Sequence, residues 1–264
     1  MLVLNQISKT FNPGTINEKK ALREIDLHLK PGDFVTVIGG NGAGKSTMLN
    51  AVAGVWPVDN GSILIDGVNV TGMPEHQRAQ FIGRVFQDPM TGTAPNMQII
   101  ENLALATRRG KKRGLRWGVT KTEREEFGEK LKILGLGLED RMTAKVGLLS
   151  GGQRQALTLM MATINPPMLL LLDEHTAALD PGAAEKILSL TTSIVEENGL
   201  TCLMVTHNMQ SALELGNRTI MMDAGRVVMD VSGVEREALE MADLLLRFKE
   251  ISGKALNNDR MLLI

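Results

Sequence analysis

The stretch Gly39-Gly40-Asn41-Gly42-Ala43-Gly44-Lys45-Ser46-Thr47 decides how this chain folds. A continuous apolar run over residues 34–38 precedes it, and an apolar-rich segment over residues 48–53 follows it. This order predicts a buried strand, a glycine loop and a helix. The spacing Gly-x4-Gly-Lys-Ser is typical of a phosphate-binding loop, in which glycines let successive backbone N–H groups and the helix N-terminus face an anion.

Two side chains of this loop are suited to bind parts of a nucleotide or its metal ion. Lys45 offers a mobile cation to the β- and γ-phosphates of a nucleotide, and the Ser46 hydroxyl is suited to bind Mg²⁺. The alternative is a glycine-rich turn with an exposed lysine. The buried strand before the loop and the helix after it favour the phosphate-binding interpretation.

The composition sets limits on the kind of protein. The chain has 264 residues, with 29 Lys and Arg against 30 Asp and Glu, so a net charge of −1 gives no overall field that would hold a nucleic acid. Its length fits one large domain with a lobe or two modest domains. The single cysteine, Cys202, excludes an internal disulfide. We find neither a leader pattern nor 18 consecutive apolar residues, so we expect no membrane crossing, although binding to a membrane protein stays possible.

Strand and helix patterns divide the chain into a sheet part and a helical part. Strand patterns occur over residues 1–87 and 166–264, including an Asp66-Gly67 turn typical of a hairpin. Helical spacing dominates residues 88–165, and one further helix is predicted over residues 234–251. We therefore predict a sheet core that is interrupted by a helical lobe and then resumes.

A second apolar strand, over residues 168–172, ends in two acids, Asp173 and Glu174. Parallel sheets bind their ligands at the carboxyl ends of the strands. We expect Asp173 to hold Mg²⁺, directly or through water, and Glu174 to accept a proton from the water that attacks the γ-phosphate. The alternative is that the two acids cap the next helix.

The third motif is Leu149-Ser150-Gly151-Gly152-Gln153. Amides at the start of a helix form an anion site, and Ser150 also suits the N-cap position. The phosphate loop, this segment and the Leu-Leu-Asp-Glu strand follow one another in an order and spacing that resembles the ATP-binding cassette (ABC) ATPases, up to about residue 230.

This resemblance implies the fold class and the arrangement of the active site. The fold would be α/β: a P-loop NTPase core with a mostly parallel sheet and an antiparallel β-subdomain, carrying an inserted α-helical subdomain. The whole chain would be one nucleotide-binding domain. Two cassettes would pair head to tail, so that Ser150, Gly151, Gly152 and Gln153 of one close over ATP held by residues 39–47 of the other.

The resemblance also implies roles for four further residues. Gln87 matches the glutamine that senses Mg²⁺ and the attacking water, although a glutamine after a strand is common. Asp180 would bridge the dimer interface, and it also suits an N-cap before Pro181. His207 matches the histidine that contacts the γ-phosphate. Phe11 would stack on adenine, or else lie in the core.

The segment Asp173-Glu174-His175-Thr176 departs from the family at His175, where proline is common. Without the fixed φ of proline, the backbone after Glu174 is predicted to be looser. An imidazole that titrates beside the general base would make the rate of hydrolysis depend on pH.

A basic segment, Arg108 to Arg124, holds eight basic residues and one acid, Glu123. It is interpreted as a solvated loop of the helical lobe. Two alternatives stay open, in which the segment with Trp117 contacts anionic lipid headgroups or a nucleic acid.

The resemblance predicts an ATPase, with ATP and Mg²⁺ as cofactors, that energises a multi-subunit transporter. We expect it to import small organic solutes such as amino acids, because residues 88–97 resemble those of an importer-like bacterial subgroup. Its partners would be a second copy or a paralogue, membrane permease subunits and a solute-binding protein, with no nucleic acid. It would lie on the cytoplasmic face of the cell membrane. The alternative is a soluble ABC ATPase that acts as an assembly factor, for instance for iron–sulfur clusters.

Overall fold

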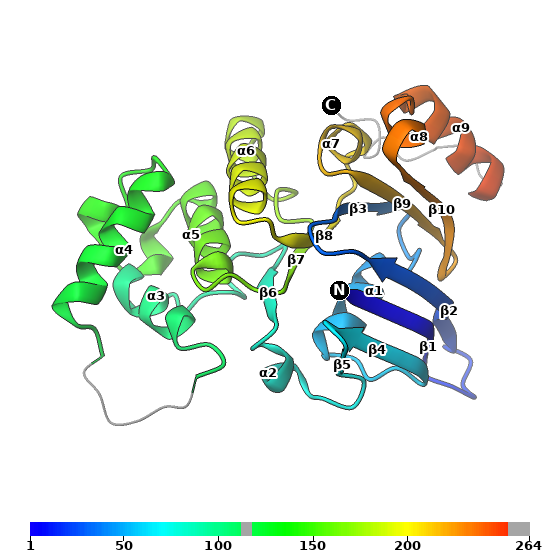
Figure 1. The fold of residues 1–264 in the computed structure, drawn as a ribbon, viewed down its shortest axis with the longest axis horizontal. Helices are drawn as coiled ribbons and strands as arrows, with labels where there is room; N and C mark the ends of the chain where they lie inside the picture. The colour runs from blue at the N-terminus through cyan, green and yellow to red at the C-terminus, as the bar shows by residue number, and fades with distance from the viewer. Residues whose placement is uncertain (112–117, 253–264) are drawn as a thin grey trace. The chain divides into compact units, whose positions relative to one another are not determined.

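The computed structural model describes residues 1–111 and 118–252 (Figure 1). These residues form two compact units. Among the described residues, the first unit consists of residues 1–78 and 199–252, and the second consists of residues 79–111 and 118–198. Each unit has strands and helices of its own, and each is described separately below.

An antiparallel sheet forms one part of the first unit. Its strand order is β2-β1-β4-β5. The strands are β1 (Leu2–Phe11), β2 (Lys19–Leu29), β4 (Asn60–Ile65) and β5 (Val68–Asn69). The predicted hairpin joins β4 to β5, because Asp66 and Gly67 both adopt the positive φ angles that a tight two-residue turn requires.

A second set of strands in the first unit has the order β10-β9-β3-β8. The strands are β3 (Phe34–Gly39), β8 (Thr201–Val205), β9 (Arg218–Asp223) and β10 (Arg226–Ser232). β3 is parallel to both β8 and β9, so it is central, and all six of its residues are buried. A strand with neighbours on two sides and both faces covered needs the continuous apolar run that the sequence has there.

The helices of the first unit include α1 (Lys45–Ala53), α7 (Met209–Glu214), α8 (Gly233–Glu237) and α9 (Met241–Ser252). The single helix predicted over residues 234–251 is wrong, because it is two helices in the structure. The amide of Glu240 donates to the Asp243 side chain at 3.0 Å, which starts a new helix there. Leu239 is buried in the break, and Phe248 of α9 joins the same apolar cluster.

The C-terminal end of α1 is capped by the side chain of Arg78, the last residue of α2 (Glu75–Arg78). Only 2% of Arg78 is exposed. Its guanidinium donates to the carbonyls of Ala51 and Val52 at 2.7 and 2.8 Å, and also to those of Met73 and Thr71. A cation at this end of a helix meets the negative end of the helix dipole. The helix that begins at the phosphate loop is thus held at its far end by a buried charge.

Replacing Arg78 with Met is expected to lower the free energy of unfolding by about 3 kcal/mol, because two buried and two partly buried carbonyls each lose a charged donor. Urea denaturation followed by circular dichroism measures the change. Arg78→Lys is the matched control. Its free energy of unfolding should fall by less than that of Arg78→Met, because lysine keeps the charge, although it offers fewer donors than arginine. Equal stability of Arg78→Met and the natural chain would contradict the capping role.

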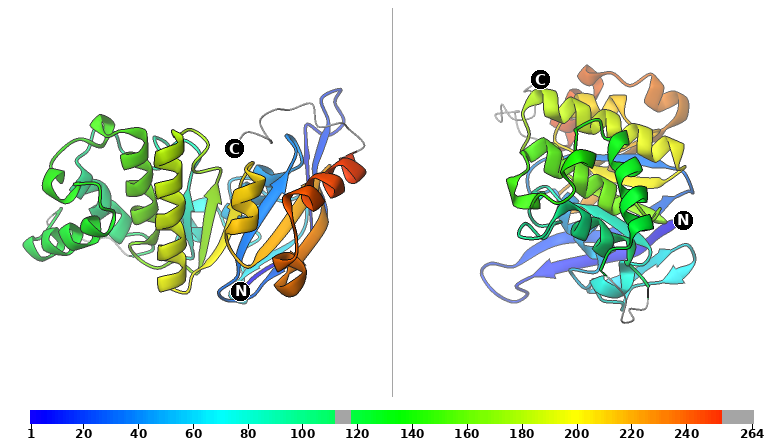
Figure 2. Two further views of the ribbon diagram at one scale, coloured as in Figure 1. Left: turned by 90° about the horizontal axis from the view of Figure 1, so that it is seen from above. Right: turned by 90° about the vertical axis from the view of Figure 1, so that its left-hand side faces the viewer.

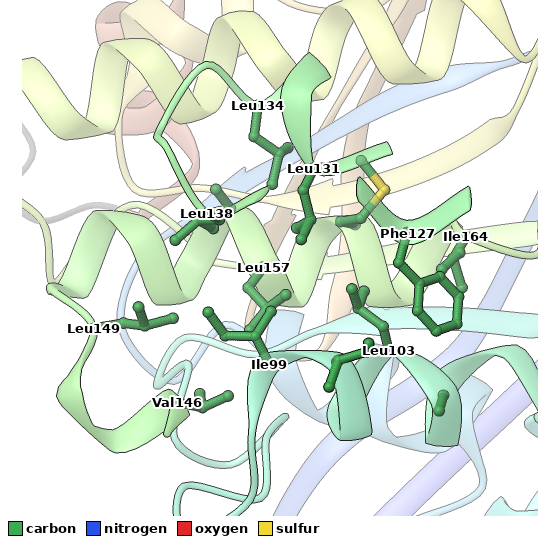
Figure 3. Close-up of a cluster of buried hydrophobic side chains, with 14 of the residues drawn as sticks. Ile99, Leu103, Phe127, Leu131, Leu134, Leu138, Val146, Leu149, Leu157 and Ile164 are labelled. Carbon is green, nitrogen blue, oxygen red and sulfur yellow. The ribbon is translucent and has the colours of Figure 1, made fainter. Parts of the chain in front are cut away.

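The second unit pairs β6 (Ile82–Val85) in parallel with β7 (Leu169–Asp173). Its helices are α3 (Ile99–Thr107), α4 (Lys121–Ile133), α5 (Gly151–Thr163) and α6 (Pro181–Glu197), with short 3-10 turns η1 (Glu139–Arg141) and η2 (Val146–Leu148). Figure 2 shows these helices gathered together. Their apolar faces meet in one buried cluster that includes Leu103, Phe127, Leu131 and Leu157 (Figure 3).

Between β6 and β7, the regular elements of the described residues are α3, α4, α5 and the two 3-10 turns, as the loss of strand patterns predicted. Within residues 1–111 and 118–252, we find no helix with both the length and the hydropathy that crossing a bilayer requires.

Candidate functional site

The phosphate-binding loop lies between β3 and α1, where the sequence placed it. Gly39 ends β3 with a φ of 148°, and a Cβ atom there would overlap the backbone carbonyl oxygen of Met222 on β9. Gly44 is the N-cap of α1, and a Cβ there would lie 2.6 Å from the Ala21 carbonyl oxygen. Glycine is therefore required at both ends of the loop, and since Gly44 has no side chain, it leaves the first turn of α1 without a side-chain cap.

Lys45 is only 5% exposed and folds back over the loop that precedes it. Its ammonium group donates to the carbonyl oxygens of Gly39 at 2.8 Å and Gly40 at 3.2 Å. The ammonium group is therefore held against the backbone of the glycine loop. Ser46 follows in the first turn of α1, and its side chain is exposed.

Two residues beside the loop were not predicted. A Cβ atom on Gly42 would lie 3.5 Å from the ammonium nitrogen of Lys19, and one on Gly40 would lie 3.4 Å from Cζ of Phe248. Lys19 is the first residue of β2, and Phe248 belongs to α9. Only the fold brings them to the loop, because both are distant from it in sequence.

Phe11, the last residue of β1, pairs in register with Lys19. It is partly exposed and makes an edge-to-face contact with Trp56, with ring centroids 5.5 Å apart. The ammonium group of Lys9 lies 5.8 Å from the centre of the Phe11 ring. The aromatic ring is thus near the phosphate loop and is held at its edge by a second aromatic residue.

His207 follows β8 in the first unit and is partly buried. Its neighbours are fixed by hydrogen bonds: the Asn208 amide donates to the Thr206 hydroxyl at 3.0 Å, and the Asn208 side chain accepts from the Ser211 amide at 2.9 Å. The backbone around His207 is therefore tied to the carboxyl end of β8 and to the start of α7.

In the second unit, Asp173 ends β7 and Glu174 follows it with a φ of 47°. Residues other than glycine rarely adopt this left-handed conformation. The Ala177 amide donates to the Glu174 carbonyl at 3.0 Å and closes a turn. The two acids therefore lie at the carboxyl end of a parallel strand, and the backbone turns sharply at the second of them.

His175 is buried, with 2% of its surface exposed. Its Nε2 atom lies 3.1 Å from the Thr191 hydroxyl on α6. Burial lowers the pKa of His175 to about 4. The imidazole is therefore neutral near pH 7, so the hypothesis that it titrates beside Glu174 in the neutral range finds no support. The segment is anchored to α6 through a side chain, in place of the looser backbone that the sequence predicted.

This buried imidazole makes stability depend on pH. The folded pKa of His175, about 4, lies below the 6.5 of the unfolded chain, so the unfolded state binds more protons between these values. The contribution of His175 to the free energy of unfolding is therefore fully present above pH 6.5. It is lost as the pH drops toward 4, and the loss is about 3 kcal/mol in total. Urea denaturation at pH 7, 6 and 5 should show that the free energy of unfolding falls more steeply with decreasing pH for the natural chain than for His175→Gln. Parallel curves would contradict this expectation.

The third motif, Leu149-Ser150-Gly151-Gly152-Gln153, hereafter the signature segment, leads into α5, and Ser150 is the N-cap of that helix. The Ser150 hydroxyl accepts from the Gln153 amide at 3.3 Å, and the Gln153 side chain accepts from the Ser150 amide at 3.2 Å. Asp180 is the N-cap of α6, and its side chain accepts from the Ala183 amide at 3.0 Å with Pro181 as the first helical residue. Both N-cap predictions are confirmed.

A cavity of about 290 Å³ joins these two helix starts within the second unit. It is lined by residues 150–153 and by residues 178–180, together with Leu136 and Lys186. The Lys186 ammonium group donates to the Gly135 carbonyl at 2.8 Å. The structure thus brings together the two segments that the sequence assigned to the dimer interface and adds a lysine that no motif indicated.

Gln87 lies two residues after β6 and is exposed. The carbonyl of the preceding residue, Phe86, accepts from the side-chain amide of Gln155 at 3.3 Å. Gln155 is fully buried on α5, two residues after the signature segment. The backbone before Gln87 is therefore linked to the helix that begins at Ser150.

The predicted site residues fall into two groups. Phe11, residues 39–47 and His207 belong to the first unit. Gln87, Asp173, Glu174, residues 150–153 and Asp180 belong to the second. Hydroxyl, amide and carboxylate oxygens occur in these groups, and oxygen donors of this kind are the ligands that Mg²⁺ prefers.

The basic segment is only partly described, because residues 112–117, with Trp117, lie outside the described residues. Arg109 donates to the carbonyls of Ala162 and Asn165 at 2.9 and 2.7 Å, at the C-terminal end of α5. Arg108 donates to the Ala104 and Gly118 carbonyls. These two arginines therefore stabilise the helical part, and they are not simply a solvated charge run.

Comparison with known proteins identifies the class. Residues 22–177 match the family model described as ABC transporter. The chain is 41% identical over 250 residues to a tyrosine transport ATP-binding protein of Clostridioides difficile, covering 94% of this chain and 99% of that one. It is 36% identical to an aliphatic sulfonates import ATP-binding protein of Albidiferax ferrireducens, covering 87% and 73%.

Solved structures agree with this class. A dimeric ATP-binding cassette in a post-hydrolysis state, bound to ADP and Pi, superposes with a TM-score of 0.75 at 32% identity, covering 88% of this chain and 98% of that one. This chain spans only 52% of a spermidine/putrescine import ATP-binding protein of Fusobacterium nucleatum, to which it is 35% identical.

The chain belongs to the ABC transporter family, and it is an ABC-type ATPase. The predicted family and the predicted α/β class, a P-loop NTPase cassette, are both confirmed. The prediction of a transport ATPase is confirmed at the level of the family, and ATP is its nucleotide.

Proposed function

We propose that this chain is the ATP-hydrolysing subunit of a multi-subunit importer for small organic solutes, with amino acids as the favoured class. The cavity shared by residues 150–153 and Asp180 carries the ATP-hydrolysing part of the proposal, since it is shaped by two helix N-termini within a chain that also has a complete phosphate loop. The relative named for tyrosine transport, which matches over nearly its whole length, supports an amino acid as the solute.

In this proposal, residues 39–47 bind the phosphates of ATP through backbone amides, and Lys45 neutralises the β- and γ-phosphates. Phe11 stacks on adenine, and the partial exposure of this residue supports that role. The substrate is MgATP, and Ser46, Gln87 and Asp173 are the residues that would provide oxygen ligands for the ion. Bound Mg²⁺ would neutralise charge on the phosphates.

Hydrolysis proceeds by in-line attack of water without a phosphoenzyme. Glu174 accepts the proton of the water, because a carboxylate at the carboxyl end of a parallel strand is well placed for a general base. His207 contacts the γ-phosphate and stabilises the attacking geometry. Gln87 orients the water, and its side chain would respond to Mg²⁺ when the ion is bound.

Two cassettes complete the site. Ser150, Gly151, Gly152 and Gln153 of a second copy, or of a paralogous ATPase, close over the bound nucleotide. Asp180 bridges the same interface. ATP would favour the closed pair and hydrolysis would release it, which couples the nucleotide to two conformations.

The whole chain acts as one nucleotide-binding domain, with residues 1–87 and 166–264 as the sheet core and residues 88–165 as the helical subdomain. It lies on the cytoplasmic face of the cell membrane and binds integral permease subunits, which work with a solute-binding protein. It binds no nucleic acid. No observation favours the alternative of a soluble assembly factor, and the relatives named above carry transport or import in their names.

Affinity purification tests the proposal. Tagged chain carrying Glu174→Gln is extracted from membranes of its native host in mild detergent with MgATP, and bound proteins are identified by mass spectrometry. We expect a multi-span permease in stoichiometric amount. Recovery with cytosolic partners alone would overturn the transporter role.

Solute uptake provides the second measurement. Host cells that lack the natural chain are complemented with it or with Glu174→Gln, and uptake of labelled tyrosine and other amino acids is measured. The natural chain should restore uptake of at least one amino acid, and the variant should not. Equal uptake by both cell lines for every amino acid would argue against amino acids as the solute class.

A further inference from the structure

His175 and Thr191 form a buried contact directly after Glu174. His175 is 2% exposed and Thr191 is fully buried, and Nε2 of the imidazole lies 3.1 Å from the threonine hydroxyl. That hydroxyl also donates to the Ile187 carbonyl at 2.8 Å, one turn back on α6. A hydroxyl has a single proton, so the Thr191 oxygen must accept from His175. The imidazole is therefore the donor, and its proton lies on Nε2.

This contact holds one side of an unusual backbone conformation. Glu174 has a φ of 47°, which a residue with a Cβ adopts only when its surroundings enforce it. Before Glu174, the chain is fixed by β7, whose residues pair with β6. After Glu174, the turn is closed by the Ala177 amide, and the imidazole of the next residue is tied to α6.

We propose that His175 is a positioning residue, which holds Glu174 in its left-handed conformation through the hydrogen bond to Thr191 and so fixes the direction of the Glu174 carboxylate. The inference rests on the proposed role of Glu174 as general base. The contact joins the residue after the base to the middle of α6, a helix of 17 residues, so the anchor is rigid. A small misplacement of a base lowers the rate of the chemical step while substrate binding is kept.

The test removes this hydrogen bond from either end in the full chain. Thr191→Val keeps the shape of the side chain without the hydroxyl, His175→Phe fills the same buried space without the donor, and Thr191→Ser keeps the acceptor as the matched control. The readouts are kcat and KM for MgATP, the affinity for a non-hydrolysable ATP analogue and the melting temperature. Thr191→Val changes α6, whereas His175→Phe changes the turn after Glu174. One of these two variants therefore remains informative if the other fails to fold.

We expect Thr191→Val and His175→Phe each to lower kcat by about ten- to a hundredfold, with KM and analogue affinity unchanged. Thr191→Ser should keep the natural kcat. The double variant should be no slower than either single variant, because both remove the same bond. A natural kcat in Thr191→Val, an equal loss in Thr191→Ser, or a fall in analogue affinity in parallel with kcat would overturn the inference.

Glu174→Gln, measured alongside, distinguishes failure of the general-base role of Glu174 from failure of the positioning role of His175. If Glu174→Gln hydrolyses ATP normally, the proposed base is wrong, and the positioning role fails with it. If Glu174→Gln is inactive while Thr191→Val keeps its kcat, only the positioning role is overturned.

Discussion

Replacing Glu174 with Gln is expected to lower ATP turnover by about 10²- to 10⁴-fold while ATP binding is retained. Glutamine has nearly the same shape as glutamate, so it should tolerate the same left-handed backbone at the end of β7. It has no carboxylate to accept the proton of the attacking water. Phosphate release measures the turnover, and size-exclusion chromatography with MgATP should show an accumulated ATP-bound dimer.

Glu196→Gln is the matched control for this result. Glu196 is an exposed glutamate of α6 in the same unit and lines neither the cavity nor the turn around Glu174. Its variant should hydrolyse ATP at the natural rate. Near-normal phosphate release by Glu174→Gln would remove Glu174 from the role of general base.

Replacing Lys45 with Ala is expected to weaken ATP binding by about ten- to a hundredfold, which is the effect of losing a charge-assisted hydrogen bond. The same change removes the two bonds from the ammonium group to the Gly39 and Gly40 carbonyls, so the glycine turn also loses its internal support. Isothermal titration measures the affinity, and the rise in melting temperature with added ATP provides an independent readout.

Lys20→Ala serves as the control for this loss, because Lys20 is an exposed lysine of β2 with no place in the phosphate loop. Its affinity for ATP should stay at the natural value. Unchanged affinity in Lys45→Ala would mean that the loop binds phosphate through its amides alone.

Local patterns could predict the strand, loop and helix around Lys45, because each part depends on residues next to one another in the chain. The glycine spacing, the apolar run of β3 and the Asp66-Gly67 turn are all of this kind. The break between α8 and α9 could not be predicted, because the apolar spacing continues through it. Leu239 keeps the helical period but lies buried where the chain changes direction.

The features of the candidate site that depend on motifs could be predicted from the sequence. The features that depend on how helices pack could not. The N-cap roles of Ser150 and Asp180 followed from residue type and position. The cavity that joins them, and the lysine that lines it, depend on how α5 and α6 pack. The partner of His175 is sixteen residues away on another element, so no local pattern could reveal that the imidazole is buried.

If Phe11 stacks on adenine as proposed, its edge-to-face contact with Trp56 would also make the chain an optical sensor of its own nucleotide. The sequence has two tryptophans and no tyrosine, so Trp117→Phe leaves Trp56 as the sole indole emitter. Its ring lies 5.5 Å from the ring that would stack on adenine. Adenine arriving on Phe11 would change the surroundings of that indole and shift its fluorescence, so ATP binding could be followed in real time without a label.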